Sequence, residues 1–370
     1  MDKVNNFFKN LFKNLFYDSK GELKNIKEVL INNAIYIIIG SMIIFIIISD
    51  YTFLSIGVFK NILTQSSVRL ILALGVGGII ILQGTDLSLG KNVGFSAIIT
   101  ASFLQSFSYG ARFYETLPDW VWRTNALGEV AGFQWFFYIL VLLVAIVVSS
   151  FFSGINGYVV AKFKVHPFLA TLGGSVAIYG IMLLYFNTSA AGPQPIGSLD
   201  PTYSSFVSNL EIFGMEIPKL IIYSILVAVV MWFVWNKTTF GKNMYAVGGN
   251  PEAAKISGVS VMKTTVMVYL LAGVLYGIGG YLEAARVGSA NTAFGLNYEL
   301  DAIAACVVGG ISFSGGIGKI SGAIAGVLMF TIITYGMVYL GIDAYYQYII
   351  KGVIIVAAVA LDTRKYIKKT

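Results

Sequence analysis

Long uncharged apolar stretches are the feature that most restricts the fold of this chain. Residues 31–49 carry no charged side chain, and about 20 such residues are enough to cross a bilayer as a helix. Further apolar stretches follow at 54–65, 68–83, 90–108, 134–153, 155–164, 167–186, 218–236, 264–284, 300–317, 318–340 and 344–361. A chain that is 57% hydrophobic and 12% charged cannot cover this surface in water. We therefore expect an all-α integral membrane protein.

Several of these stretches are too short or too rich in glycine to cross a membrane alone. We expect eight to ten crossings and favour ten, with broken or re-entrant helices at 54–65, 84–90 and 155–164, because such segments are tolerated inside protein. Glycines four residues apart predict close helix packing in lipid. They are Gly273 and Gly277, and then Gly318, Gly322 and Gly326.

The basic residues predict the orientation of the chain. Lysines and arginines gather at 1–29, in the loop 237–263 and in the tail 363–370, whereas the loop 187–217 has none and 109–133 has two against three acids. The positive-inside rule then places both termini and the loop 237–263 in the cytoplasm. Both termini on one side require an even number of crossings, which excludes nine.

The same pattern defines the expected domain organisation. Residues 30–362 are expected to form one membrane domain, followed by a basic cytoplasmic tail at 363–370. The cytoplasmic segment 1–29 has apolar residues at intervals of three and four, which favours an amphipathic helix on the membrane surface over a disordered tail.

The sequence offers little for catalysis, metal binding or nucleotide binding. A single Cys and a single His exclude a disulfide framework and a multi-His or Cys-rich metal site, and no nucleophile has an identifiable base partner. None of the Gly-Lys pairs at 90–91, 241–242 and 318–319 fits a phosphate-binding loop. We expect a non-catalytic chain that binds no metal, ATP or other cofactor, and no nucleic acid.

Polar residues inside apolar stretches are the candidates for function. Asp86 lies in the segment 84–90 (GTDLSLG), where it either caps a half-helix starting at Leu87 or serves a solute pathway. Lys351 lies in an apolar run and needs a carboxylate partner such as Asp301, in a structural pair or a proton relay. Glu283 and Arg286 have the helical spacing of an ion pair.

The loop 237–263 contains the most informative short segment. Asn250 suits an N-cap, Pro251 the first helical position, Glu252 the first turn, and Gly258 a helix stop. A helix of about two turns is expected on the cytoplasmic side. It is either a well-capped connection or a docking helix for a cytoplasmic partner. Its residues are Asn250, Pro251, Glu252, Ala253, Ala254, Lys255, Ile256, Ser257 and Gly258.

These segments, in this order, resemble the permease subunits of carbohydrate ABC importers of the ribose and galactoside branch, over residues 60–362. The matching stretches are 84–90, 156–173, 245–258 (YAVGGNPEAAKISG), 283–288 (EAARVG), 298–310 (YELDAIAACVVGG), 312–316 (SFSGG) and 346–352. Residues 312–316 and 359–362 look most like the galactose and methyl-galactoside members. Candidate polar groups within these stretches are Asp86, Ser88, Asn156, Thr171, Asp301 and Lys351.

The resemblance implies a mechanism and partners. Two permease copies would form the pathway in the bacterial cytoplasmic membrane, surrounded by lipid. A sugar-binding protein outside would deliver the sugar, and a cytoplasmic ABC ATPase would dock on 250–258. The implied cargo is a monosaccharide, galactose, methyl galactoside or glucose, with ribose, other sugars or nucleosides as alternatives.

Other classes are kept as alternatives. Asp86, Asp301 and Lys351 would also suit an ion-coupled secondary sugar transporter. A membrane enzyme would need a catalytic pair that the sequence does not display, and a channel would need a recognisable filter or charged ring.

Overall fold

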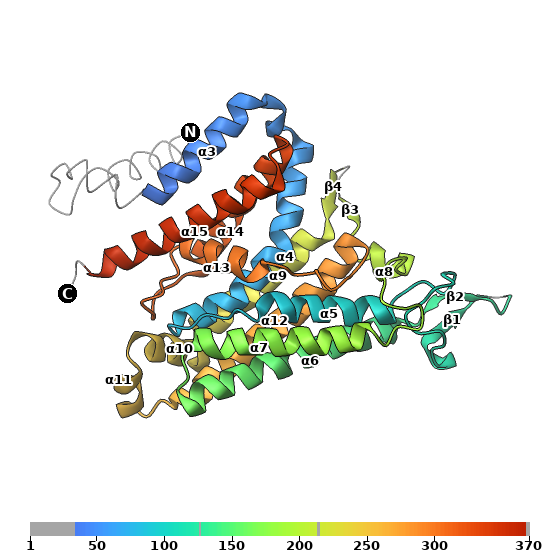
Figure 1. The fold of residues 1–370 in the computed structure, drawn as a ribbon, viewed down its shortest axis with the longest axis horizontal. Helices are drawn as coiled ribbons and strands as arrows, with labels where there is room; N and C mark the ends of the chain where they lie inside the picture. The colour runs from blue at the N-terminus through green and yellow to red at the C-terminus, as the bar shows by residue number, and fades with distance from the viewer. Residues whose placement is uncertain (1–33, 126, 213–214, 368–370) are drawn as a thin grey trace. The chain divides into compact units, whose positions relative to one another are not determined.

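The computed structural model describes residues 34–125, 127–212 and 215–367. The expected amphipathic segment at 1–29 lies outside them. The chain divides into two compact units, Ser55–Thr331 and a smaller one made of Met1–Leu54 and Ile332–Thr370, and each is described by itself (Figure 1). The prediction of one membrane domain over 30–362 stays a prediction.

The larger unit is built mainly from helices. They are α4 (Ile56–Ile81), α5 (Leu89–Phe103), α6 (Trp135–Phe163), α7 (Pro167–Phe186), α8 (Pro201–Ser205), α9 (Lys219–Lys237), α10 (Thr239–Gly249), α11 (Pro251–Ile256), α12 (Val261–Val287) and α13 (Tyr298–Val308), and α14 (Ile320–Tyr339) begins in it. The smaller unit holds α3 (Ala34–Ser49), the rest of α14, and α15 (Ala344–Ile367), which continues into the predicted tail.

Six of the described helices are long and apolar enough to cross a membrane, namely α4, α6, α7, α9, α12 and α14. Two shorter apolar helical segments, Ile39–Ser49 and Ala344–Ala360, lie in α3 and α15. The expectation of a helical membrane protein is confirmed, whereas the count of about ten crossings is not confirmed.

Two of the expected helix breaks are wrong. Residues 54–65 and 68–83 mostly belong to one helix, α4, and 134–153 and 155–164 belong to α6. In α4 the hydroxyls of Thr64, Ser66 and Ser67 donate to the carbonyl oxygens four residues before them, so these polar residues are satisfied inside the helix. The expected interruption after α4 is present, because the chain is non-helical from Leu82 to Ser88.

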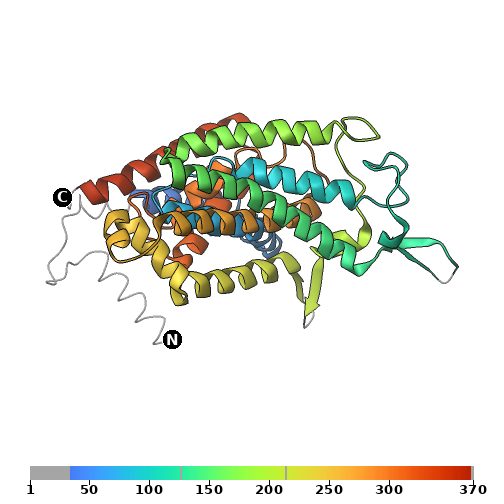
Figure 2. The same ribbon diagram turned by 90° about the horizontal axis from the view of Figure 1, so that it is seen from below.

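Helix α12 lies at the centre of the larger unit. It packs against α4, α5 and α6, and α5, α6, α7 and α12 run alongside one another (Figures 1 and 2). A Cβ placed on Gly273 would lie 2.5 Å from the Cα atom of Ser150, and one on Gly277 would lie 2.6 Å from the Cα atom of Ile146. The glycine spacing therefore marks backbone contact between α12 and α6, as predicted.

The second glycine series also serves helix packing. A Cβ on Gly322 would overlap the carbonyl oxygen of Gly309, and one on Gly326 would overlap that of Ala305. Backbone contact therefore joins the start of α14 to α13 within the larger unit, as the spacing predicts.

The two loops that are predicted to face outward depart from the all-α expectation. Residues 109–133 contain the antiparallel hairpin β1 (Trp122–Thr124) and β2 (Val130–Phe133), and 187–217 contribute β3 (Asn209–Ile212) and β4 (Met215–Pro218) to another. The β1–β2 hairpin and α11 lie at opposite ends of the larger unit (Figure 2). The strands are only three or four residues long, which is too short for a hydrophobic alternation to be read in the sequence.

The contact between α6 and α12 can be tested by adding a single methyl group. We expect Gly277→Ala to lower the stability of the protein by about 1–3 kcal/mol, because overpacking forces two backbones apart. The midpoint of thermal unfolding in detergent measures the effect.

Gly173→Ala in α7 is the matched control, since a Cβ there meets no atom within 4 Å. It should leave stability unchanged or raise it by up to about 1 kcal/mol, because alanine is the better helix former. Equal stability of the two variants would contradict the predicted contact.

Candidate functional site

The turn between α4 and α5 places a carboxylate in the interior of the larger unit. Asp86 is buried, and its Oδ1 accepts hydrogen bonds from the backbone nitrogen of Ser88 at 2.9 Å and from the Ser88 hydroxyl at 2.6 Å. Helix α5 begins at Leu89 with Ser88 as its N-cap residue. The prediction of a helix that starts at Leu87 with Asp86 as its cap is therefore wrong. Instead, Asp86 closes an Asx turn on the residue two positions ahead.

Ser88 joins this turn to α5 and α6. Its oxygen accepts from Nδ2 of Asn156 at 2.9 Å and from Nδ2 of Asn92 at 3.3 Å. Nδ2 of Asn92 also lies 3.3 Å from the hydroxyl of Ser153. All four side chains are buried, so this network holds two helices together where water does not compete.

Thr171 brings α7 to the same turn. Its hydroxyl accepts from the backbone nitrogen of Leu87 at 3.1 Å and donates to the carbonyl oxygen of Pro167 at 2.9 Å. The structure thus brings together four of the predicted polar residues, Asp86, Ser88, Asn156 and Thr171. We call this group, with Asn92 and Ser153, the polar cluster.

Two tyrosines of α12 complete the surroundings of Asp86. Tyr269 and Tyr276 are fully buried and close enough to interact with Asp86 electrostatically. The hydroxyl of Tyr276 lies within reach of the Asp86 carboxylate, whereas the hydroxyl of Tyr269 has no hydrogen-bond partner within the described part of the chain. An interior carboxylate among neutral hydroxyls is costly in a membrane protein and marks a functional candidate.

Four residues of this region were not predicted from the sequence. Asn92 follows Ser88 by four positions and Ser153 precedes Asn156 by three, so helical spacing could have identified both. Tyr269 and Tyr276 lie on the same face of α12, but nothing in the sequence connects that face with Asp86.

Asp301 and Lys351 lie in different units. Asp301 is in the first turn of α13 in the larger unit, and Lys351 belongs to α15 in the smaller unit. Their pairing, whether structural or as a proton relay, stays a prediction.

The predicted ion pair at the end of α12 is confirmed. Arg286 donates from Nε to Oε2 of Glu283 at 2.6 Å and from Nη2 to Oε1 at 2.7 Å. The hydroxyl of Tyr298, at the start of α13, donates to the same carboxylate at 2.7 Å. The hydrogen bond from Tyr298 therefore ties this ion pair of α12 to α13.

The capped helix in the loop 237–263 forms as the sequence predicts. Oδ1 of Asn250 accepts from the backbone nitrogen of Ala253 at 3.0 Å, and Gly258 has a φ of 84° beyond the helix end. Helix α11 spans Pro251–Ile256, slightly less than the expected two turns, and Ser257 is its C-cap. Ala254 is buried, whereas Ile256 is 88% exposed.

The preceding helix, α10, is attached to the loop before α14. The hydroxyl of Tyr245 donates to the carbonyl oxygen of Gly318 at 2.9 Å. Burial raises the pKa of Tyr245, so this hydroxyl stays protonated and remains a donor. The exposed helix α11 thus follows a helix, α10, that is held in place by this hydrogen bond.

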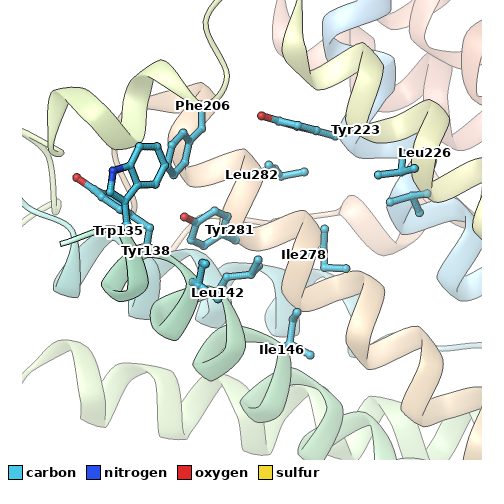
Figure 3. Close-up of a pocket in the computed structure, with 12 residues that line it drawn as sticks. Trp135, Tyr138, Leu142, Ile146, Phe206, Tyr223, Leu226, Ile278, Tyr281 and Leu282 are labelled. Atoms are coloured by element: carbon cyan, nitrogen blue, oxygen red, sulfur yellow. The ribbon is translucent and has the colours of Figure 1, made fainter. Parts of the chain in front are cut away.

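An apolar groove of about 380 Å³ lies between α6, α9 and α12. Trp135, Tyr138, Phe206 and Tyr281 gather at one end, and aliphatic side chains such as Ile146 and Ile278 line the other (Figure 3). The lining exposes almost only carbon, and the hydroxyl of Tyr138 is already bonded to Asp200 at 2.7 Å. The groove therefore lacks the convergent polar groups that a sugar needs.

Comparisons with known proteins agree with a transport role. Residues 58–359 match the family described as branched-chain amino acid transport system / permease component. The chain is 46% identical to the galactose/methyl galactoside import permease protein MglC of Haemophilus influenzae over 92% of this chain and 97% of that protein. It is 44% identical to MglC of Escherichia coli, over 95% and 98% of the two chains.

A ribose permease is a more distant relative. The ribose import permease protein RbsC of Escherichia coli is 32% identical over 89% of this chain and 93% of its own length. No solved structure matches the chain.

The polar cluster can be tested at its central hydroxyl. We expect Ser88→Ala to destabilise the purified protein by about 1–3 kcal/mol, because buried amide groups of Asn92 and Asn156 lose their acceptor. Thermal unfolding in detergent measures this loss.

Ser205→Ala is the control, because the hydroxyl of Ser205 is exposed and donates to a single carbonyl oxygen. It should change stability by less than about 0.5 kcal/mol. If Ser88→Ala has no larger effect, Ser88 does not hold the cluster together.

Proposed function

Because the chain belongs to the branched-chain amino acid transport system / permease component family, we propose that it is the membrane-spanning permease of an ATP-driven importer for galactose and methyl galactoside. The observation that carries the substrate class is the identity of 44–46% with galactose/methyl galactoside import permeases over nearly the full length of both chains. Identity with the ribose permease is 32%, which makes ribose the weaker candidate.

The energy for transport would come from a separate subunit. As a permease component, this chain would bind no ATP, and a cytoplasmic ABC ATPase would dock on residues 250–258. Helix α11 supports this role, since it is capped at both ends and carries the exposed Ile256. The helix before it, α10, is held by the hydrogen bond from Tyr245 to Gly318. A single apolar side chain on a rigid, solvated helix is a suitable anchor for a partner.

The remaining partners follow from the same proposal. A sugar-binding protein would deliver the cargo on the other side, and two permease copies would enclose the pathway. Helix α7 supports a second copy, because it has the smallest share of buried residues among the six long apolar helices of the described chain. The permease would span the bacterial cytoplasmic membrane several times, with both termini in the cytoplasm as the basic residues predict.

Docking on α11 can be tested by changing the exposed isoleucine. We expect Ile256→Asp to weaken co-purification of the ATPase at least about tenfold, since burial of an isoleucine side chain contributes about 1.5–3 kcal/mol. Replacing 251–257 with a Gly/Ser linker should abolish both co-purification and sugar-stimulated ATP hydrolysis.

Leu127→Asp is the matched control, because Leu127 is 83% exposed and lies between the strands of the β1–β2 hairpin at the opposite end of the larger unit. Co-purification of the ATPase should be unaffected by this change. Unchanged co-purification after the linker replacement would rule out docking on α11.

Sugar uptake by this chain alone in liposomes, under a proton or sodium gradient, would instead support a secondary transporter.

The polar cluster should matter for transport. Asp86→Ala removes a carboxylate that accepts two hydrogen bonds from Ser88, each worth about 1.5–3 kcal/mol when one partner is charged. We expect sugar uptake into liposomes carrying the complete importer to fall about tenfold or more. Normal uptake at normal protein levels would make Asp86 a dispensable turn residue.

A further inference from the structure

A single glutamine bridges the end of α4, the end of α10 and the loop before α14. Nε2 of Gln83 donates to the carbonyl oxygen of Gly248 at 2.9 Å and to that of Ser314 at 3.0 Å. These partners lie 165 and 231 residues away in the sequence. One side-chain amide thus joins three segments of the larger unit.

The backbone of Gln83 is held in an uncommon conformation. Its φ is 62°, its nitrogen donates to the carbonyl oxygen of Ile80 at 2.8 Å, and the nitrogen of Gly84 donates to that of Ile79 at 2.9 Å. These two bonds form a Schellman motif at the end of α4, in which the left-handed position is usually glycine. A glutamine is unfavourable there, so the amide bridge supplies a reason for its presence.

The three segments also touch through their backbones. The nitrogen of Gly316 donates to the carbonyl oxygen of Ile81 at 2.8 Å, and a Cβ on Gly248 would overlap that same oxygen. A Cβ on Gly315 would overlap both the side chain of Gln83 and the carbonyl oxygen of Gly248. With no space between them, α10 and the end of α4 must move together.

This junction connects the two candidate sites of the protein. On one side, Gly248 and Gly249 end α10, and Asn250 caps the start of the docking helix α11. On the other side, Gln83 is followed within three residues by Asp86 of the polar cluster. We propose that Gln83 is a positioning residue that transmits movement of α11 to the turn containing Asp86.

The proposal rests on the proposed function. It explains why a glutamine occupies the left-handed position at the end of α4, which folding stability alone does not explain. Gln83 is exposed, so its two hydrogen bonds compete with water and add little to folding. The glycine contacts hold the segments close, whereas the amide determines which carbonyl oxygens of the two neighbouring segments are engaged. Its loss should therefore affect coupling more than stability.

The test uses the complete importer, with this chain, its ATPase and its sugar-binding protein, in liposomes. Gln83→Glu keeps the shape of the side chain but replaces the donating amide with a carboxylate that faces two carbonyl oxygens. We expect basal ATP hydrolysis and the yield of the complex to stay as in the wild type. Stimulation of hydrolysis by sugar-loaded binding protein and sugar uptake per ATP should fall about fivefold or more.

Gln83→Gly is the second variant, because glycine adopts a positive φ without strain and keeps the helix end intact. It should uncouple to a similar extent, since it also removes the amide. The matched control is Gln134→Glu. Gln134 is half-buried and donates from Nε2 to the carbonyl oxygen of Trp122 at 3.1 Å, so it loses the same kind of bond away from α10. Its uptake per ATP should equal that of the wild type.

Each outcome decides a different point. If sugar does not stimulate hydrolysis in the wild-type importer, the proposed function itself fails. If the wild type is coupled and Gln83→Gly retains full uptake per ATP, the positioning role is refuted. Loss of the ATPase from either Gln83 variant would also refute it, because Gln83 would then be a direct contact with the partner.

Discussion

Backbone contact of α12 with α5 and α6 is the constraint on which the larger unit depends. Gly273 and Gly277 leave no space for a side chain against α6, and a Cβ on Gly280 would lie 2.7 Å from the carbonyl oxygen of Val93 in α5. In lipid, packing of this kind replaces the hydrophobic effect as the force between helices. It also brings Tyr269 and Tyr276 of α12 to the turn that holds Asp86.

The same packing explains how polar groups are distributed. Asn92, Ser153 and Asn156 face one another across α5 and α6, and the amide nitrogens of the two asparagines donate to the hydroxyls of Ser88 and Ser153. The side chains of the polar cluster are buried in this structure. The cluster therefore connects helices and does not line an open sugar site. In the proposed mechanism, alternating access would have to rearrange this turn, and Gln83 connects the turn to Gly248 at the end of α10, next to α11.

Predictions from the sequence succeeded where residues close together in the chain determine the structure. The bounds of α7 match the expected 167–186, the caps of α11 follow from Asn250 and Gly258, and Glu283 pairs with Arg286. They failed in α4 and α6, where the apolar stretches were divided at Ser66 and Ser67 and at Gly154. Those hydroxyls bond within their own helix, and the glycine contacts α12: a Cβ on Gly154 would lie 2.7 Å from the side chain of Leu270.

The sequence by itself determined the membrane class, the helical periods, the local caps and the resemblance to a transport family, because each depends on neighbouring residues or on motif order. Only the tertiary structure decided which polar residues meet. Asp86 lies near Tyr276, and Gln83 bonds to Gly248 and Ser314, through contacts between segments far apart in the chain. Such contacts are determined by helix packing against glycine surfaces, and the spacing along one segment carries no information about its partner.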